Sequence, residues 1–86
     1  METDPIGAKR LALSRLGEQL TQWRALRGIG AGELARRSDV SLASIRRMEK
    51  GAANPSIGTV AKVADALGCD VSVQFVARAD AGASPR

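Results

Sequence analysis

Basic side chains are concentrated in one half of this 86-residue chain. The stretch from Lys9 to Lys50 contains ten basic and four acidic residues, a local charge of +6, whereas the rest contains three basic and five acidic residues, a local charge of −2. A basic surface of this kind is typical of proteins that bind phosphate groups. On charge alone, a solvated face that keeps the protein soluble is an equally good interpretation. The choice between the two depends on which secondary-structure elements carry the charges.

The chain has few residues that could support catalysis, metal binding or a disulfide. It has no His and a single Cys, which excludes most metal sites, Ser-His-Asp and Cys-His catalysis, and intramolecular disulfides. No acid, base and nucleophile converge, so we expect no enzyme, no metal and no cofactor. Gly28, Gly30 and Gly32 follow a helical pattern instead of a strand, which argues against a dinucleotide-binding loop. Cys69 is interpreted as a packing residue.

The length of the chain limits it to one small domain. A monomeric core of this size contributes only a few kcal/mol, so a partner subunit is an early expectation. No apolar run approaches the ~20 residues of a membrane span, and no signal-peptide pattern opens the chain. We therefore expect a cytoplasmic protein without membrane contact.

The segment from Ile29 to Gly51 has the pattern of two short helices joined by a tight turn. A polar break at Ser38 and Asp39 separates the helices, and the hydroxyl of Ser41 can cap the second one. This is the pattern of a helix-turn-helix whose second helix carries arginines. The residues expected to pack inward are Leu34, Val40, Ile45 and Met48. Those expected to point outward are Leu42, Ala43, Arg46, Arg47 and Lys50.

Further helices are predicted on both sides of this pair. The upstream helix ends at Gly28, and Gly17 within it is expected to permit close packing. Its apolar stripe consists of Leu13, Leu16, Leu20 and Trp23. The downstream helix is capped by Ser56 and ends at Gly68. Its stripe consists of Ile57, Val60, Val63, Ala64 and Leu67. Residues 1–8 show no periodic pattern and are predicted to be a flexible arm. The expected core is aliphatic and surrounds Trp23 and Phe75.

The period changes from helical to alternating after Gly68. Val71, Val73 and Phe75 alternate with polar residues, which predicts one β-strand over residues 69–76. A lone strand leaves its backbone groups unpaired, so it needs a partner. The simplest partner is the same strand of a second copy, which makes these three residues a dimer interface. The alternative is an extended tail lying on its own domain. Residues 77–86 are small and polar and are predicted to be disordered.

Several short motifs together carry a resemblance to a known family. They are RALRG at the end of the first helix, ELA in the second, VS before the third, MEKG at its end, and NPS followed by ALG. From Leu16 to Gly68 the chain resembles the Xre, or Cro/C1-type, helix-turn-helix family. The resemblance implies an all-α fold of four to five helices, with a DNA-binding domain over residues 9–68.

The resemblance also assigns roles to individual residues. The helix from Leu42 to Lys50 matches the recognition helix, and the positions that match contacts to bases or nearby phosphates are Ser41, Leu42, Ala43, Ser44 and Arg47. Arg47 suits bidentate contact with guanine, which contributes on the order of 1 to 3 kcal/mol of discrimination. Leu42 and Ala43 offer apolar contact, and Arg46 and Lys50 are placed for phosphates. Arg24 matches a family arginine that pairs with Glu49; a plain phosphate contact is its alternative role.

Two positions depart from the family pattern. Helix two usually opens with Thr or Ser followed by Gln, where this chain has Gly30 and Ala31. The remaining contact at Gly30, Ala31 and Gly32 is from backbone N–H groups and the helix dipole to a phosphate. Asp39 replaces the usual turn glycine, and Asp tolerates left-handed geometry better than most residues.

These features imply a homodimer that places two recognition helices about 34 Å apart on a palindromic operator in double-stranded DNA. A strand after the fourth helix is similar to antitoxins of type II toxin-antitoxin operons, particularly HipB-like and HigA-like proteins. The expected function is that of a transcriptional repressor that represses its own operon and neutralises a toxin encoded beside it. A stand-alone phage, plasmid or chromosomal repressor is the alternative; a protein-interaction module without DNA binding is a third possibility, against which the basic third helix argues.

Overall fold

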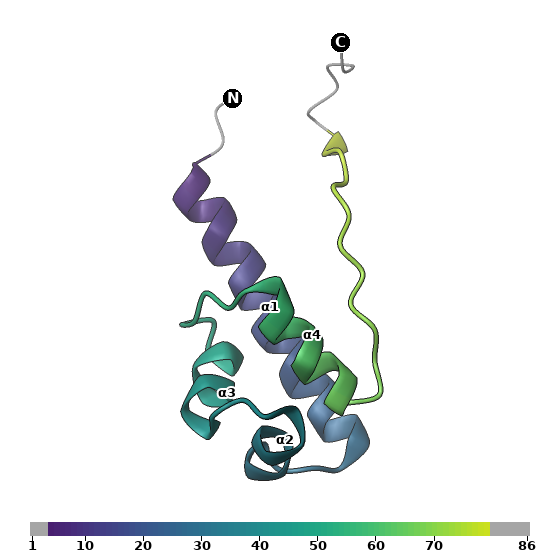
Figure 1. Ribbon diagram of the computed structural model, residues 1–86. Helices are drawn as coiled ribbons and strands as arrows, with labels where there is room; N and C mark the ends of the chain where they lie inside the picture. The colour runs from purple at the N-terminus through teal and green to yellow at the C-terminus, as the bar shows by residue number, and fades with distance from the viewer. Residues whose placement is uncertain (1–3, 80–86) are drawn as a thin grey trace.

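The computed structural model describes residues 4–79 of the chain, and within them it contains four α-helices. These are α1 (Pro5–Arg27), α2 (Ala31–Ser38), α3 (Leu42–Glu49) and α4 (Ile57–Ala66). As Figure 1 shows, α1 runs the length of the molecule, with α2, α3 and α4 gathered around its C-terminal half. The all-α prediction is confirmed. No helix within residues 4–79 combines the length and apolarity that a bilayer crossing requires.

Local capping determines where α1 begins and ends. The Asp4 carboxylate accepts a hydrogen bond from the Ile6 N–H (3.0 Å), and Pro5 occupies the first turn, where its missing N–H costs nothing. At the other end, Gly28 adopts φ 67°, ψ 32°, a left-handed conformation that suits glycine. The predicted flexible arm over residues 1–8 is therefore wrong for Pro5 to Ala8, which belong to α1. Residues 1–3 lie outside the described range.

The core is aliphatic and is formed between the four helices, where α3 packs on α1, and α2 packs on both α3 and α4. Its buried apolar members are Leu20, Leu34, Ile45, Met48, Ala53, Val63 and Leu67. Leu34 and Ile45 are fully buried, as their inward-facing positions predict. The expected aromatic centre is wrong: Trp23 is 38% exposed and Phe75 is completely exposed. Trp23 remains at the rim because it lines the open space between α1, α4 and the tail, and the Arg27 guanidinium lies 5.1 Å from its ring centre.

Gly17 marks that close contact between α1 and α3. A Cβ atom placed on Gly17 would lie 2.6 Å from the Met48 carbonyl oxygen and 2.7 Å from that of Glu49. No side chain fits there, so the glycine sets how near the two helices approach. The expectation of close packing at Gly17 agrees with this geometry.

The chain beyond α4 is extended but forms no β-strand within residues 4–79. The Cys69 N–H donates to the Ala64 carbonyl oxygen (2.8 Å), and residues 70–77 make no backbone–backbone hydrogen bond to another described residue. The prediction of a strand over residues 69–76 is thus wrong for the described part of the chain, because a strand exists only through a paired ladder and residues 4–79 contain no second strand. Figure 1 shows this tail beside α4 and α1, running towards the N-terminal end of α1.

The predicted packing of the tail against the helices also differs from the structure. Val71 is 36% exposed, Val73 is 65% exposed, and the fully exposed Phe75 does not pack against the core. Of the predicted disordered tail over residues 77–86, residues 80–86 lie outside the described range.

Candidate nucleic-acid interface

The turn between α2 and α3 holds the two helices in a fixed relation. Asp39 ends α2 with φ 58°, ψ 38°, and the Val40 N–H donates to the Ala35 carbonyl oxygen (3.2 Å). Ser41 then starts α3, where its hydroxyl oxygen accepts a hydrogen bond from the Ser44 N–H (3.1 Å). Aspartate therefore adopts the left-handed conformation that the family pattern usually gives to glycine, as its tolerance of this region predicts.

The outer face of α3 carries the predicted contact residues. Ile45 and Met48 anchor the helix in the core, while Arg46, Arg47 and Lys50 are exposed on the opposite side. Ser41 and Ala43 are also exposed, whereas Leu42 and Ser44 are half-buried. Leu42 therefore presents only part of its side chain, which is less than its predicted outward position suggests.

Arg24 and Glu49 join α1 to the end of α3. The Arg24 Nε atom lies 2.8 Å from Glu49 Oε2, its Nη2 lies 3.3 Å from Oε1, and its Nη1 donates to the Ile29 carbonyl oxygen (3.2 Å). The hydrogen bonds to Glu49 raise the pKa of Arg24, and its partial burial offsets this only in part. A bidentate pair with both side chains largely enclosed fixes the direction of α3 relative to α1.

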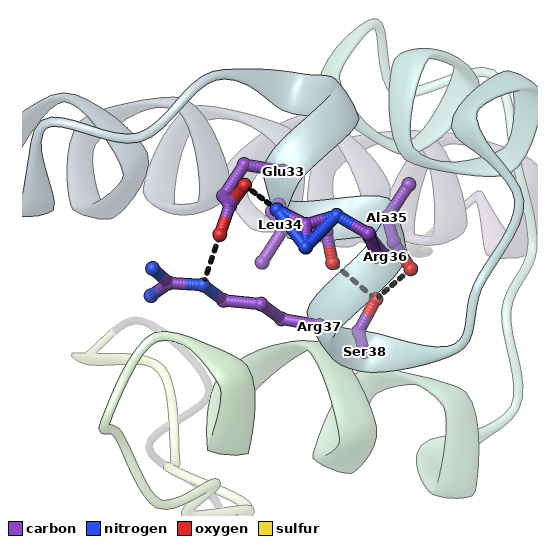
Figure 2. Close-up of polar contacts among 6 residues, drawn as sticks. All are labelled: Glu33, Leu34, Ala35, Arg36, Arg37 and Ser38. Carbon is purple, nitrogen blue, oxygen red and sulfur yellow. Dashed lines mark hydrogen bonds and ion pairs between the residues drawn. The ribbon is translucent and has the colours of Figure 1, made fainter.

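Three further arginines of α1 and α2 are held in place by hydrogen bonds. The Arg27 Nε–H donates to the Leu67 carbonyl oxygen (2.8 Å), which ties the C-terminal ends of α1 and α4 together. Figure 2 shows Glu33 between Arg36 and Arg37: its Oε1 accepts from Arg36 Nη2, and its Oε2 accepts from Arg37 Nε (2.6 Å). These bonds, with that from Arg37 the larger influence, hold the pKa of Glu33 below its usual value.

By contrast, the two arginines of α3 and its C-cap residue Lys50 are uncompensated within the described residues. The side chains of Arg46, Arg47 and Lys50 make no hydrogen bond or ion pair with any residue in the described range 4–79. Sequence reasoning missed the pairing of Glu33, although its spacing of three and four residues from Arg36 and Arg37 is a recognisable signal. Arginines with an intramolecular hydrogen bond thus have a structural role, whereas Arg46, Arg47 and Lys50 remain available to an anion.

The start of α2 offers backbone groups in place of side chains. Gly30 is its N-cap and provides no side-chain hydrogen bond, and the space around Gly30 and Gly32 is open to 4 Å. The N–H groups of the first turn therefore remain for solvent or an anion. Ala31 is half-buried, and Figure 2 shows that the Ser38 hydroxyl donates to the Leu34 carbonyl oxygen (2.7 Å) at the other end of the helix.

An apolar groove of about 540 Å³ lies between α1, α4 and the first residues of the tail. We refer to it as the α1–α4 groove. Its apolar lining includes Leu16, Trp23, Ile57, Val60, Val71 and Val73. Sequence reasoning did not predict it, because it assigned the same apolar stripes of α1 and α4 to a closed core. Val71 and Val73, two of the three predicted dimer residues, line this groove, whereas Phe75 lies beyond it.

A family model described as a helix-turn-helix domain matches residues 15–74. This chain belongs to the helix-turn-helix family. The match covers the turn, the free cations of α3 and the first part of the tail, and membership in this family supports DNA binding. Neither the curated proteins nor the solved structures yield a match to the chain. The helix-turn-helix match begins at Arg15, so the first ten residues of α1 precede it.

Proposed function

We propose that this protein is a sequence-specific transcriptional repressor of the Xre type that inserts α3 into the major groove of DNA. The observation that carries the proposal is the outer face of α3, where Arg46, Arg47 and Lys50 have no hydrogen-bond or ion-pair partner within residues 4–79 while Arg24, Arg27, Arg36 and Arg37 all do. Uncompensated cations on a rigidly anchored helix are suited to an anionic partner.

Each residue of this surface has a distinct role in the proposal. Arg47 reads a guanine edge, and the exposed Ala43 and half-buried Leu42 make apolar contacts such as that with a thymine methyl. Arg46 and Lys50 bind phosphates. Ser41 and Ser44 hydrogen-bond to each other through their hydroxyls (2.9 Å), so their contribution is to hold the start of α3 against the DNA. The N–H groups at Gly30, Ala31 and Gly32 bind a further phosphate.

Binding assays on single substitutions test this surface. Arg47→Ala should reduce the preference for the operator over unrelated DNA by about 1 to 3 kcal/mol. Arg46→Ala and Lys50→Ala should weaken binding to all sequences and lower the slope of log affinity against log salt by about 1 each. Arg15→Ala is the matched control, because Arg15 lines the α1–α4 groove on another side of the molecule. It is compared at equal oligomeric state, checked by light scattering, because the same groove belongs to the dimer contact proposed below. Unchanged affinity and preference in all three α3 variants would refute the proposal.

We further propose that two copies associate through the tail and the α1–α4 groove. Within the described residues 4–79, the backbone groups of residues 70–77 make no backbone–backbone hydrogen bond, and apolar surface remains exposed beside them at Val73 and Phe75. An antiparallel pairing of two tails satisfies the backbone groups and covers this surface at once. The dimer then presents two α3 helices about one DNA turn, roughly 34 Å, apart to a palindromic operator.

The antitoxin role is the more specific part of the proposal. Its support is the position of the tail directly after α4, as in HipB-like and HigA-like antitoxins. Co-expression of this chain with the product of the adjacent gene tests it: an antitoxin should co-purify with that product and relieve its toxicity. A protein that binds its operator but relieves no toxicity and retains no such partner would instead be a stand-alone repressor.

A further inference from the structure

The N-terminal part of α1 projects beyond the helices that form the core. The helix has 23 residues and is thus about 34 Å long, in a molecule whose longest extent is 45 Å. Every residue from Asp4 to Ala12 is exposed, including Ile6 (62%) and Leu11 (52%). Figure 1 shows this part of α1 extending past α3 and α4. It is a rigid element that the core does not require for its packing.

One side of this projecting segment is aligned with α3. The C-terminal turn of α3 crosses α1 at Gly17, and the following Gly51 lies over Ser14, where a Cβ on Gly51 would be 3.3 Å from Ser14 Cα. Arg10 precedes Ser14 by four residues and Gly17 by seven, so it is on the same face of α1, about one helical turn beyond Gly51. Arg10 is exposed and makes no hydrogen bond or ion pair within residues 4–79.

The neighbouring side of α3 carries two of its three free cations. Glu49 faces α1 through its pair with Arg24, and Arg46 precedes Glu49 by three residues and Lys50 by four. Arg46 and Lys50 therefore form a row on the flank of α3 nearest to α1. Arg47 lies on the other flank, where it lines a shallow pocket of about 150 Å³ with Asn54 and Thr59.

We infer that Arg10 is a further DNA-phosphate contact, which continues the row of Arg46 and Lys50 from α3 onto the projecting part of α1. The inference rests on the proposed DNA binding by α3. It assigns the first turns of α1 a role as a rigid arm along the DNA backbone, outside the residues that the helix-turn-helix model covers. A guanidinium on a preformed helix loses less freedom on binding than one on a flexible arm.

Salt-dependent binding of a non-specific DNA duplex tests the inference, because it needs no knowledge of the operator. Arg10→Ala in the full chain should lower the slope of log affinity against log salt by about 0.9, the value for one released phosphate contact. Arg10→Lys should restore most of the slope, since it retains the charge. Arg15→Ala is the control: it removes the same charge from the groove side of α1 and, once light scattering shows that it keeps the oligomeric state of the unmodified protein, it should leave the slope unchanged.

Two results would overturn the inference while leaving the proposed function intact. One is a slope for Arg10→Ala equal to that of the unmodified protein while Arg46→Ala lowers it. The other is an equal loss for Arg10→Ala and Arg15→Ala, which indicates a general effect of net charge. If the α3 variants also leave binding unchanged, the proposed DNA binding itself fails. Because Arg10 is exposed, circular dichroism of its variants should match that of the unmodified protein.

Discussion

At the scale of single residues, Gly17 controls the position of α3 on α1. In Gly17→Ala the new Cβ would meet the backbone carbonyl oxygens of Met48 and Glu49 at 2.6 and 2.7 Å, so the helices must separate. The strain costs about 1 to 3 kcal/mol, against a gain of up to ~1 kcal/mol from the better helix propensity of Ala. We expect net destabilisation in urea unfolding, together with weaker DNA binding because Arg24 and Glu49 are pulled apart.

The control for this prediction is Gly32→Ala, because the position of its Cβ meets no atom within 4 Å. It should leave the free energy of unfolding unchanged or raise it by up to about 1 kcal/mol. If Gly17→Ala were as stable as Gly32→Ala, the close approach of α1 and α3 would not be what requires the glycine.

The roles of individual residues could be predicted from the sequence only where a local spacing or the family resemblance supplied them. The ion pair of Arg24 with Glu49 joins positions 25 apart in the chain, and no periodicity points to it; the resemblance did. The bond from Arg27 to the Leu67 carbonyl oxygen has a backbone acceptor 40 residues away, and a sequence carries no sign of such a partner. The division of arginines into fixed and free groups therefore emerges only from the structure.

At the scale of elements, α2 is stabilised by the carboxylate of Glu33 in its first turn. The pKa of Glu33 is held below its usual value by hydrogen bonds from Arg37 and Arg36, so its contribution to stability is present above the unfolded-state pKa of about 4.3 and is lost as pH falls through the folded-state pKa. Glu33→Gln lacks this contribution. The difference in unfolding free energy between the two proteins should therefore be largest near about pH 6 and shrink towards about pH 3.

Glu18→Gln provides the comparison for this pH dependence, since Glu18 is exposed on α1 and forms no hydrogen bond or ion pair within residues 4–79. Its unfolding curve should follow that of the unmodified protein across the same range. A constant difference between Glu33→Gln and the unmodified protein at all pH values would mean that the charge of Glu33 does not stabilise α2.

The helices themselves were predictable because their signals are local. Apolar spacing and the capping residues Ser41 and Ser56 lie within or beside each helix, and the structure follows them closely. The early start of α1 was also encoded locally, by Asp4 and Pro5, but residues 1–8 have no periodic apolar pattern that would reveal a helix. The tail differs in kind: whether residues 69–76 form a strand depends on a partner outside the chain, and alternation alone cannot supply one.

At the scale of the whole molecule, the two proposed surfaces are separate. The cations proposed to bind DNA lie on α3, at its C-cap Lys50 and on the projecting part of α1, whereas Val71 and Val73 line the α1–α4 groove and Phe75 follows them on the tail. A protein arranged in this way can bind DNA through one surface and a second copy through the other without competition between them. Dimer formation should therefore be separable from DNA binding by substitution.

The oligomeric state of tail variants tests this separation. Full-length protein should have the mass of two copies in light scattering, and truncation after Cys69 should yield a monomer. Phe75→Asp should also yield a monomer, because Phe75 is on the tail face that alternation groups with Val71 and Val73. Val76→Asp is the matched control on the opposite face; it adds the same charge to an equally exposed stretch and should remain a dimer.

DNA binding of the same variants completes the prediction. Monomeric Phe75→Asp should retain the salt slope of a single subunit on non-specific DNA but lose the added affinity that two linked α3 helices have for a palindrome. A dimer that survives truncation after Cys69 would place the interface on the helices instead of the tail. A full-length protein that is monomeric at all concentrations would contradict the two-fold arrangement and leave recognition to one α3 per DNA site.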